Sequence, residues 1–509
     1  MKETLRYLIW TLGVTLWMTV CFVIPDFVDN PVGNWQTMLA VTAYITAVGI
    51  FQFFVVFLLG FNRYACTALL PLYALAGSVC AYYRLIYHVT ITPLLLDAAL
   101  HTHAREAAGV ISIWLIVWII INVGVAILVS VYRFRKIRMA MPAWLWVAAA
   151  AMMVGYYAAI PRLKQALVMR FPVNLVYSIS ECIAAANRPA VVRQYPKLVS
   201  AEVPDSLVVV AVIGEAARAD HMQLNGYPRM TNPLLSQDSH TVSLPHIYSQ
   251  YTNTNGSVPH LLTRADSAHT DYAYTEHSFV SLFHQTGFHT VWLSNKNQTK
   301  PFRDFMEEAD TIEYTAAARA QSLYAKWLDG DMLPLMDTYL GQQPRQLFVL
   351  HTMGSHWLYD THVSDDLFLF QPVVSNRDVR QNSQEQIINS YDNTMVYLDA
   401  FLYDIISRVR DYPAILLYLS DHGESLGEGG RYLHAQVNAE EENYPAALVW
   451  YSDKYQALFP EKVEALQKNS LYRYRTDYFF YSILSAAGMQ AEGDNASLNI
   501  FIPKTEPTP

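Results

Sequence analysis

Five uncharged, strongly apolar stretches in the first third of the chain constrain its fold more than any other feature. Each is long enough to cross the ~30 Å hydrocarbon core of a bilayer as a helix. The first is too long for a removable signal peptide and lacks the small-residue cleavage pattern of one. We therefore predict five membrane spans, at residues 7–25, 38–61, 65–83, 107–132 and 139–161.

The basic residues around these spans predict how the chain lies in a membrane. Lys and Arg next to a span are retained in the cytoplasm. They gather at the N-terminus and in the second and fourth connections, whereas the first connection carries Asp26 and Asp29 and no base. The N-terminus is therefore predicted to be cytoplasmic, and an odd number of spans exports the C-terminal half. In a bacterium this places the chain in the inner membrane with its second half in the periplasm.

Hydropathy falls after Arg162, so we predict a five-span membrane domain at 1–162, a linker with short helices at 163–205 and an exported domain at 206–509. With 52% hydrophobic and 16% charged residues, the chain is too apolar for a wholly soluble enzyme and too charged for a pure membrane bundle. The net charge of −9 excludes the dense basic face of a nucleic-acid binder. Four scattered cysteines exclude a disulfide scaffold and a zinc knuckle.

The exported half alternates short β-branched runs with longer amphipathic ones, which is typical of an α/β domain. Continuous apolar strands between helices indicate a mostly parallel sheet that is covered on both faces. In such sheets the chemistry gathers at the carboxyl ends of the strands. The predicted strands lie at 207–213, 290–293, 347–351, 414–419 and 446–450, and helical patterns include 385–408 and 462–468.

Three of these strands end in residues that can bind a metal. Glu215 follows the first, His351 and His356 follow the third, and Asp421 and His422 follow the fourth. A single carboxylate at a strand end is more often a helix cap or an ion-pair partner. Three such ends in one domain instead favour one crevice that collects carboxylate oxygens and imidazole nitrogens. That donor set suits Zn²⁺ or Mn²⁺ in a catalytic site with an open position for substrate.

Several motifs, taken in order, resemble those of the membrane-anchored phosphoethanolamine transferases. This family is part of the sulfatase-like branch of the alkaline phosphatase superfamily. The resemblance covers nearly the whole chain and implies a multi-pass helical membrane domain followed by an exported sulfatase-like α/β domain. The motifs are GEAAR at 214–218, LNGYPR at 224–229, TNP at 231–233, YDN at 391–393, SDHGESLG at 420–427 and YLH at 432–434.

The resemblance also implies which residues perform the chemistry. The family's metal ligands fall on Glu215, Asp421 and His422, and its threonine nucleophile is a further ligand. That threonine precedes a Ser-Val-Pro sequence, found here at 257–259, which selects Thr254, with Thr252 as the competitor. Coordination to a dication would lower the pKa of the threonine hydroxyl and make it reactive.

Four further residues are predicted from the resemblance to bind substrate. His356 and His434 match two histidines that bind the phosphate of phosphoethanolamine or a second metal. Asn295 and Lys300 fall where the family keeps polar groups near the transferred phosphate. A cation there would offset charge on the phosphoryl oxygens, although a solvated basic loop is the alternative.

The predicted function is metal-dependent transfer of phosphoethanolamine from phosphatidylethanolamine to an envelope acceptor through Thr254. The chain lacks the family's disulfide around the nucleophile loop, with Gln250 and His260 in the cysteine positions, and has Trp357-Leu358 after a site histidine. These departures favour a lipopolysaccharide sugar over lipid A as the acceptor. A phosphoglycerol transferase and a catalytically silent scaffold are the alternatives. A sulfatase is disfavoured because Leu261 replaces the arginine of its modification motif.

Overall fold

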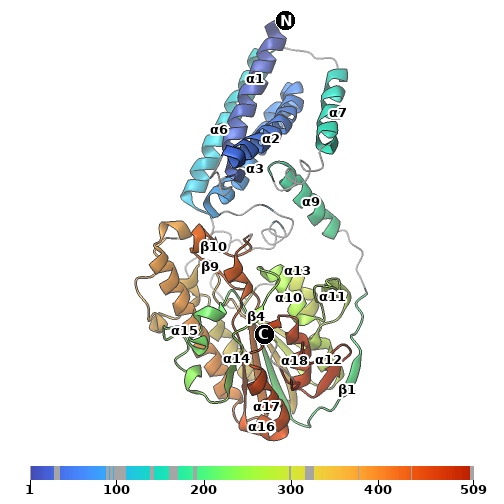
Figure 1. Cartoon of the computed structure of the whole chain (residues 1–509), viewed down its shortest axis with the longest axis vertical. Coiled ribbons are helices and arrows are strands. Elements are labelled where there is room, and N and C mark those ends of the chain that lie inside the picture. Colours follow the sequence, from blue (N-terminus) through green and yellow to red (C-terminus); the bar gives the residue numbers. More distant parts are fainter. Residues whose placement is uncertain are drawn as a thin grey trace. The chain divides into compact units, whose positions relative to one another are not determined.

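A computed structural model describes most of the 509-residue chain, which divides near residue 188 into two compact units (Figure 1). The described residues are 2–27, 35–87, 91, 96, 111–137, 143–159, 170–186, 192–296, 300–315, 326–376, 378–436 and 438–504.

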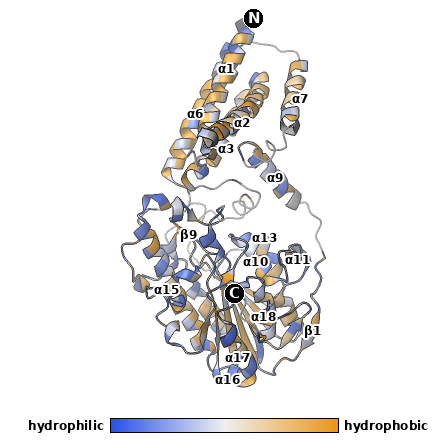
Figure 2. Cartoon of the chain, viewed as in Figure 1, coloured by the Kyte–Doolittle hydropathy of each residue, from blue (hydrophilic) through white to orange (hydrophobic). Residues whose placement is uncertain are grey.

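The first unit is helical. Among the described residues, four apolar segments are long enough to cross a membrane, namely Glu3–Phe27, Val41–Phe61, Arg63–Ile86 and Ile113–Lys136. Figure 2 shows hydrophobic residues along them. The predicted fifth span forms a helix of 17 residues, about 26 Å long, and its flanks lie outside the described residues, so this span remains a prediction. The helices are α1 (Lys2–Met18), α2 (Trp35–Phe61), α3 (Arg63–Tyr87), α6 (Ile113–Lys136), α7 (Ala143–Ala159) and α9 (Val173–Ala186).

Two buried or partly buried polar side chains link helices of this unit through hydrogen bonds. Arg133 of α6 donates from Nε to the carbonyl of Gly60 at 2.8 Å and from Nη1 to the carbonyl of Ile137 at 2.6 Å. Tyr73 of α3 donates to the side-chain oxygen of Gln52 of α2 at 2.7 Å. Because an unpaired polar group in an apolar interior is costly, these bonds fix α2, α3 and α6 against one another.

The second unit is built on a seven-stranded sheet of order β3-β11-β8-β2-β7-β5-β6. The five strands from β8 to β6 are parallel, as predicted, whereas β11 is antiparallel to both of its neighbours. The strands are β2 (Leu207–Gly214), β3 (Thr241–Ser243), β5 (His289–Ser294), β6 (Thr311–Tyr314), β7 (Arg345–His351), β8 (Ala414–Ser420) and β11 (Ala447–Tyr451).

Helices cover the two faces of this sheet. Every residue of β2 is buried, which explains its unbroken apolar sequence LVVVAVIG. On one face the core joins the sheet to α10 (Thr254–Leu262), α12 (Phe279–Gln285), α17 (Pro460–Asn469) and α18 (Tyr478–Ala486). The other side carries α14 (Leu333–Tyr339) and α15 (Gln384–Val409) (Figure 1). A capping box between Ser383 and Gln386 starts α15.

Short elements complete the domain and carry two of the predicted site residues. Strand β9 (Ser425–Leu426) pairs antiparallel with β10 (Tyr432–Leu433). This hairpin brings His434, which follows β10, next to Glu424, which precedes β9. Helix α13 (Lys300–Met306) follows β5. The other elements are β1 (Leu198–Ala201) paired with β13 (Met489–Ala491), β4 (Ile247–Tyr248) paired with β12 (Tyr474–Arg475), α11 (Tyr272–Thr275) and α16 (Asp453–Leu458).

Candidate active site

The site lies where the central parallel strands end. Gly214 of β2 pairs with Ser420 of β8, so the next residues, Glu215 and Asp421, leave the sheet side by side. Ile213 pairs with His351 of β7, and His351 pairs in turn with Ser294 of β5. The strand register therefore brings the three predicted ligand-bearing ends to one edge, as expected for a parallel sheet.

The turn that follows β2 is held in an unusual backbone conformation. Ala216 has φ +54°, in the left-handed region that non-glycine residues rarely adopt. Its amide donates to Asp421 Oδ1 at 3.2 Å. From the neighbouring strand end, Ser355 donates its amide to the Glu215 carbonyl at 3.0 Å. A Cβ at Gly354 would lie 2.6 Å from that carbonyl, so only glycine permits this approach.

The predicted metal ligands converge as one cluster. Glu215 Oε1 and Asp421 Oδ2 each lie 3.5 Å from His422 Nε2, and all three side chains are fully buried. A tetrahedral site with ~2.0 Å bonds separates its ligand atoms by about 3.3 Å, so this spacing fits Zn²⁺. Asp421 Oδ2 and His422 Nε2 are also buried with no hydrogen-bond partner. Such atoms are costly unless a cation binds them, and the cluster therefore fits a metal.

Thr254 is the threonine whose hydroxyl reaches this cluster. It is the first residue of α10, and its hydroxyl donates to Glu215 Oε2 at 3.0 Å. The Asn253 side chain caps the helix by accepting from the Gly256 amide at 3.0 Å. The positive end of the helix dipole favours negative charge at Thr254. The competitor, Thr252, is fixed through its carbonyl, which accepts from the Ala435 amide at 3.0 Å.

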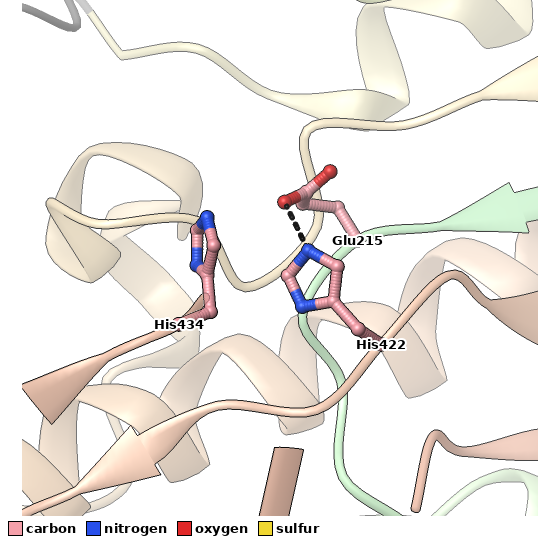
Figure 3. Close-up of side chains that lie close together, drawn as sticks. All are labelled: Glu215, His422 and His434. Carbon is pink, nitrogen blue, oxygen red and sulfur yellow. Dashed lines mark ion pairs between the residues drawn. The ribbon is translucent and has the colours of Figure 1, made fainter. Parts of the chain in front are cut away.

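The two predicted histidines lie beside the metal cluster. The His434 ring centroid is 4.4 Å from that of His422 and 5.9 Å from that of His356. Glu215, His422 and His434 each offer a ligand atom within 4.8 Å of the others (Figure 3). His434 bonds through Nδ1 to buried Glu424 at 2.8 Å. The sequence analysis assigned no role to Glu424, although a site histidine commonly bonds a carboxylate through its second nitrogen.

Burial and neighbouring charges perturb the titration of this cluster. Burial alone would raise the pKa of Glu215, but the Lys296 ammonium and nearby imidazoles hold it well below its usual range. Burial and the charge of Glu215 raise the pKa of Asp421 to about 8. Burial would lower the pKa of His434, but Glu424 raises it to about 9. Burial and His434 lower the pKa of His422 to about 3, so its imidazole is neutral.

The segment after β5 differs in detail from the sequence-based picture. Asn295 is buried, donates from Nδ2 to Asp329 at 2.5 Å and accepts from the Thr315 hydroxyl at 2.6 Å. Lys300 begins α13, and its side chain lies outside the described part of the structure. Lys296, which the sequence analysis passed over, contacts the Glu215 carboxylate with its ammonium group. Its position next to Asn295, which was predicted to lie near the phosphate, could have indicated Lys296 from the sequence.

Comparison with known families accounts for both units of the chain. Residues 208–489 match the sulfatase family, and residues 49–185 match the family described as phosphoethanolamine transferase EptA/EptB. The chain belongs to the sulfatase family. Its matching membrane region places it in the membrane-anchored phosphoethanolamine transferase branch.

Individual relatives agree with this assignment. The chain is 26% identical over 465 residues to phosphoethanolamine transferase EptA of Escherichia coli K12, covering 84% of each protein. It is 30% identical over 308 residues to EptA of Salmonella typhimurium, a match that spans 58% of this chain and 56% of that protein.

Solved structures show the same fold. Lipooligosaccharide phosphoethanolamine transferase A, an integral membrane protein of Neisseria meningitidis, aligns with a TM-score of 0.81 over 96% of this chain and 97% of its own, at 20% identity. The C-terminal periplasmic domain of EptC from Escherichia coli, in complex with Zn, aligns with a TM-score of 0.54 at 22% identity, covering 62% of this chain and 92% of that one.

Proposed function

We propose that the chain transfers phosphoethanolamine from phosphatidylethanolamine to an envelope acceptor through a covalent intermediate on Thr254. The observation that carries the proposal is the Thr254 hydroxyl, which is hydrogen-bonded to Glu215 inside the cluster formed with Asp421 and His422. Membership of the phosphoethanolamine transferase branch supports the group that is transferred. A lipopolysaccharide sugar is the preferred acceptor, and lipid A is the alternative.

Glu215, Asp421 and His422, together with the Thr254 oxygen, would hold one dication, Zn²⁺ in preference to Mn²⁺. The ligand spacing and the presence of Zn in a related domain support this choice. When bound, the dication lowers the pKa of a coordinated alcohol and offsets charge on phosphoryl oxygens.

In the first step, a bond forms between Thr254 Oγ and phosphorus while the bond from phosphorus to the diacylglycerol oxygen breaks. Glu215 orients the hydroxyl as its hydrogen-bond acceptor, the hydroxyl proton passes to solvent, and the departing oxygen takes a proton from His434. In the second step, an acceptor oxygen bonds to phosphorus and the bond to Thr254 breaks. The acceptor proton restores His434, and Thr254 recovers a proton from solvent.

The donor is a membrane lipid, and an enzyme anchored beside it meets it at high effective concentration. The apolar helices of the first unit support this anchoring. The proposed arrangement has a cytoplasmic N-terminus and a periplasmic catalytic domain in the bacterial inner membrane.

The nucleophile is tested by incubating the zinc-loaded full chain in detergent with phosphatidylethanolamine and measuring its intact mass. Wild type should gain one phosphoethanolamine, and Thr254→Ala should lose this adduct and at least about 10³-fold of the transfer rate. Thr252→Ala, from the same loop, should behave as wild type. An adduct in Thr254→Ala at the wild-type rate contradicts the proposal. An adduct formed from phosphatidylglycerol alone would instead favour phosphoglycerol transfer.

The acceptor is tested by mass spectrometry of lipopolysaccharide from cells that carry wild type or Thr254→Ala. We expect a phosphoethanolamine increment on core-sugar fragments in wild type alone. An increment restricted to lipid A fragments would overturn the preferred acceptor and leave the transfer reaction standing.

A further inference from the structure

A lysine ammonium lies inside the cluster of metal ligands and has no role in the reaction described above. Lys296 is the second residue after β5, and its side chain is only 13% exposed. Its ammonium contacts Glu215 Oε2, the same oxygen that accepts from the Thr254 hydroxyl. Lys296 and the nucleophile therefore face one carboxylate oxygen.

The backbone at Lys296 is held by hydrogen bonds of the two residues that precede it. The Ser294 hydroxyl donates to the Lys296 carbonyl at 2.8 Å and accepts from its amide at 3.2 Å. The preceding Asn295 donates its amide to the His351 carbonyl at 2.9 Å. These bonds tie the residue to two adjacent strand ends, so its backbone position follows from the sheet.

Electrostatics within the site agree with this placement. His351 is fully buried, and its pKa is lowered to about 3, first by burial and then by the charge of Lys296. The same ammonium counteracts the rise in the pKa of Asp421. Its charge is therefore felt on both sides of the cluster, at the end of β7 and at the end of β8.

The charges of the side chains, the dication and the donor phosphodiester together indicate a role for the Lys296 ammonium. The carboxylates of Glu215 and Asp421 match the two charges of a dication. The His434 imidazolium already has a partner in Glu424, at 2.8 Å. A phosphodiester donor brings one further negative charge, and its phosphoryl oxygens carry that charge through the transition state. Among the described residues, Lys296 lies beside the nucleophile and offers one matching positive charge.

We propose that the Lys296 ammonium binds a non-bridging oxygen of the phosphoryl group while Thr254 attacks phosphorus. This inference rests on the proposed function and deepens it, because it assigns the cation that recognises the phosphodiester. The predicted roles of Asn295 and Lys300 near the phosphate stay predictions beside it. Lys296 acts from the residue next to Asn295, where Ser294 fixes the backbone beside the metal ligands.

The test compares Lys296→Met, Lys296→Arg and the control Lys468→Met, in which an exposed lysine of α17 is changed. The first measurement is calorimetric binding of inorganic phosphate to the zinc-loaded full chain in detergent. Lys296→Met should bind phosphate at least about 10-fold more weakly, Lys296→Arg should restore most of the affinity, and the control should match wild type. Phosphate affinity unchanged in Lys296→Met overturns the proposal.

Two further readings separate this role from a structural one. Zinc affinity, from competition with a chelator, should not weaken in Lys296→Met, because an ammonium cannot ligate the metal. A loss of zinc affinity of about 10-fold or more would make Lys296 part of the metal site and overturn the proposal. The rate of adduct formation on Thr254 should fall by about 10²-fold and recover with arginine. If wild type binds phosphate through Lys296 but forms no adduct from phosphatidylethanolamine, the proposed function fails and this inference survives as a phosphate site.

Discussion

At the scale of single residues, the site combines groups whose environments push their pKa values apart. Burial would lower the pKa of His434, but the Glu424 carboxylate raises it to about 9. The pKa of the neighbouring His422 is instead lowered to about 3. One histidine is thus kept protonated and the other neutral at the same pH. Such a separation suits the proposed roles of His434 as an acid and His422 as a metal ligand.

This separation predicts the effect of Glu424→Gln. Glu424 accepts from His434 and from the Tyr359 hydroxyl at 2.9 Å. Without the carboxylate charge, His434 releases its proton at lower pH. Between pH 6.5 and 8.5, where His434 of wild type is still protonated, the rate of phosphoethanolamine transfer in the variant should therefore be lower than in wild type by about 10-fold or more. The measurement is the pH profile of adduct formation on Thr254. Tyr359→Phe is the control, since it keeps the charge and should keep the profile. A wild-type profile in Glu424→Gln would contradict this role.

Sequence reasoning predicted most of the clustered residues and missed others for a physical reason. Glu215, Asp421 and His422 follow strands directly, so strand register alone brings them together. Lys296 lies in a loop, where side-chain direction depends on contacts such as those of Ser294 rather than on a repeating pattern. The carboxylate partner of His434 is ten residues away along the chain and becomes a neighbour through the β9–β10 hairpin.

At the scale of elements, the segment before β1 is attached to the helix that follows the Lys296 loop. The Arg193 guanidinium lies 4.0 Å from the ring centroid of Phe305 in α13 and 3.8 Å from Glu308. Tyr195 stacks on His277 at 4.1 Å, and His277 bonds Glu308 at 3.0 Å. These contacts hold residues 192–196 against α13, which starts a few residues after Lys296.

We predict that Arg193→Met loosens this attachment. Arg193 is 14% exposed and Glu308 is 7% exposed, so loss of the cation leaves a mostly buried carboxylate with fewer partners and costs about 1–2 kcal/mol. Hydrogen exchange of the full chain should quicken in residues 192–196 and 300–308. Arg303→Met is the control, because Arg303 is 59% exposed on the same helix. Equal exchange in both variants would show that Arg193 does not hold the segment.

The elements themselves were largely predictable, with instructive exceptions. Apolar length and composition predicted the helices of the first unit, and unbroken apolar runs predicted the central strands. The antiparallel direction of β11 was not predictable, because a strand that is buried on both faces has an apolar sequence whichever way it runs. Within the described residues, α7 has 17 residues, whereas the shortest of the four segments that are long enough to cross has 21, so the length of α7 alone does not decide whether it spans.

At the scale of the whole molecule, the number of crossings decides the side on which the catalytic domain functions. Four crossings return the chain to the side of its N-terminus, and a fifth, through α7, places the second unit opposite. Basic residues at the end of α6, including Arg135 and Lys136, favour a cytoplasmic position there. A periplasmic active site therefore requires that α7 cross the membrane.

This requirement predicts the labelling pattern of single cysteines in a chain freed of Cys21, Cys66, Cys80 and Cys182. Lys468→Cys, at a position 70% exposed in α17, should react with a membrane-impermeant maleimide in intact spheroplasts. Lys136→Cys, exposed at the end of α6, should react only after the membrane is permeabilised. Labelling both before and after permeabilisation, and checking transfer activity of each variant, controls for misfolding. If both cysteines react only after permeabilisation, α7 does not cross and the catalytic domain faces the cytoplasm, where an outward-facing acceptor is out of reach.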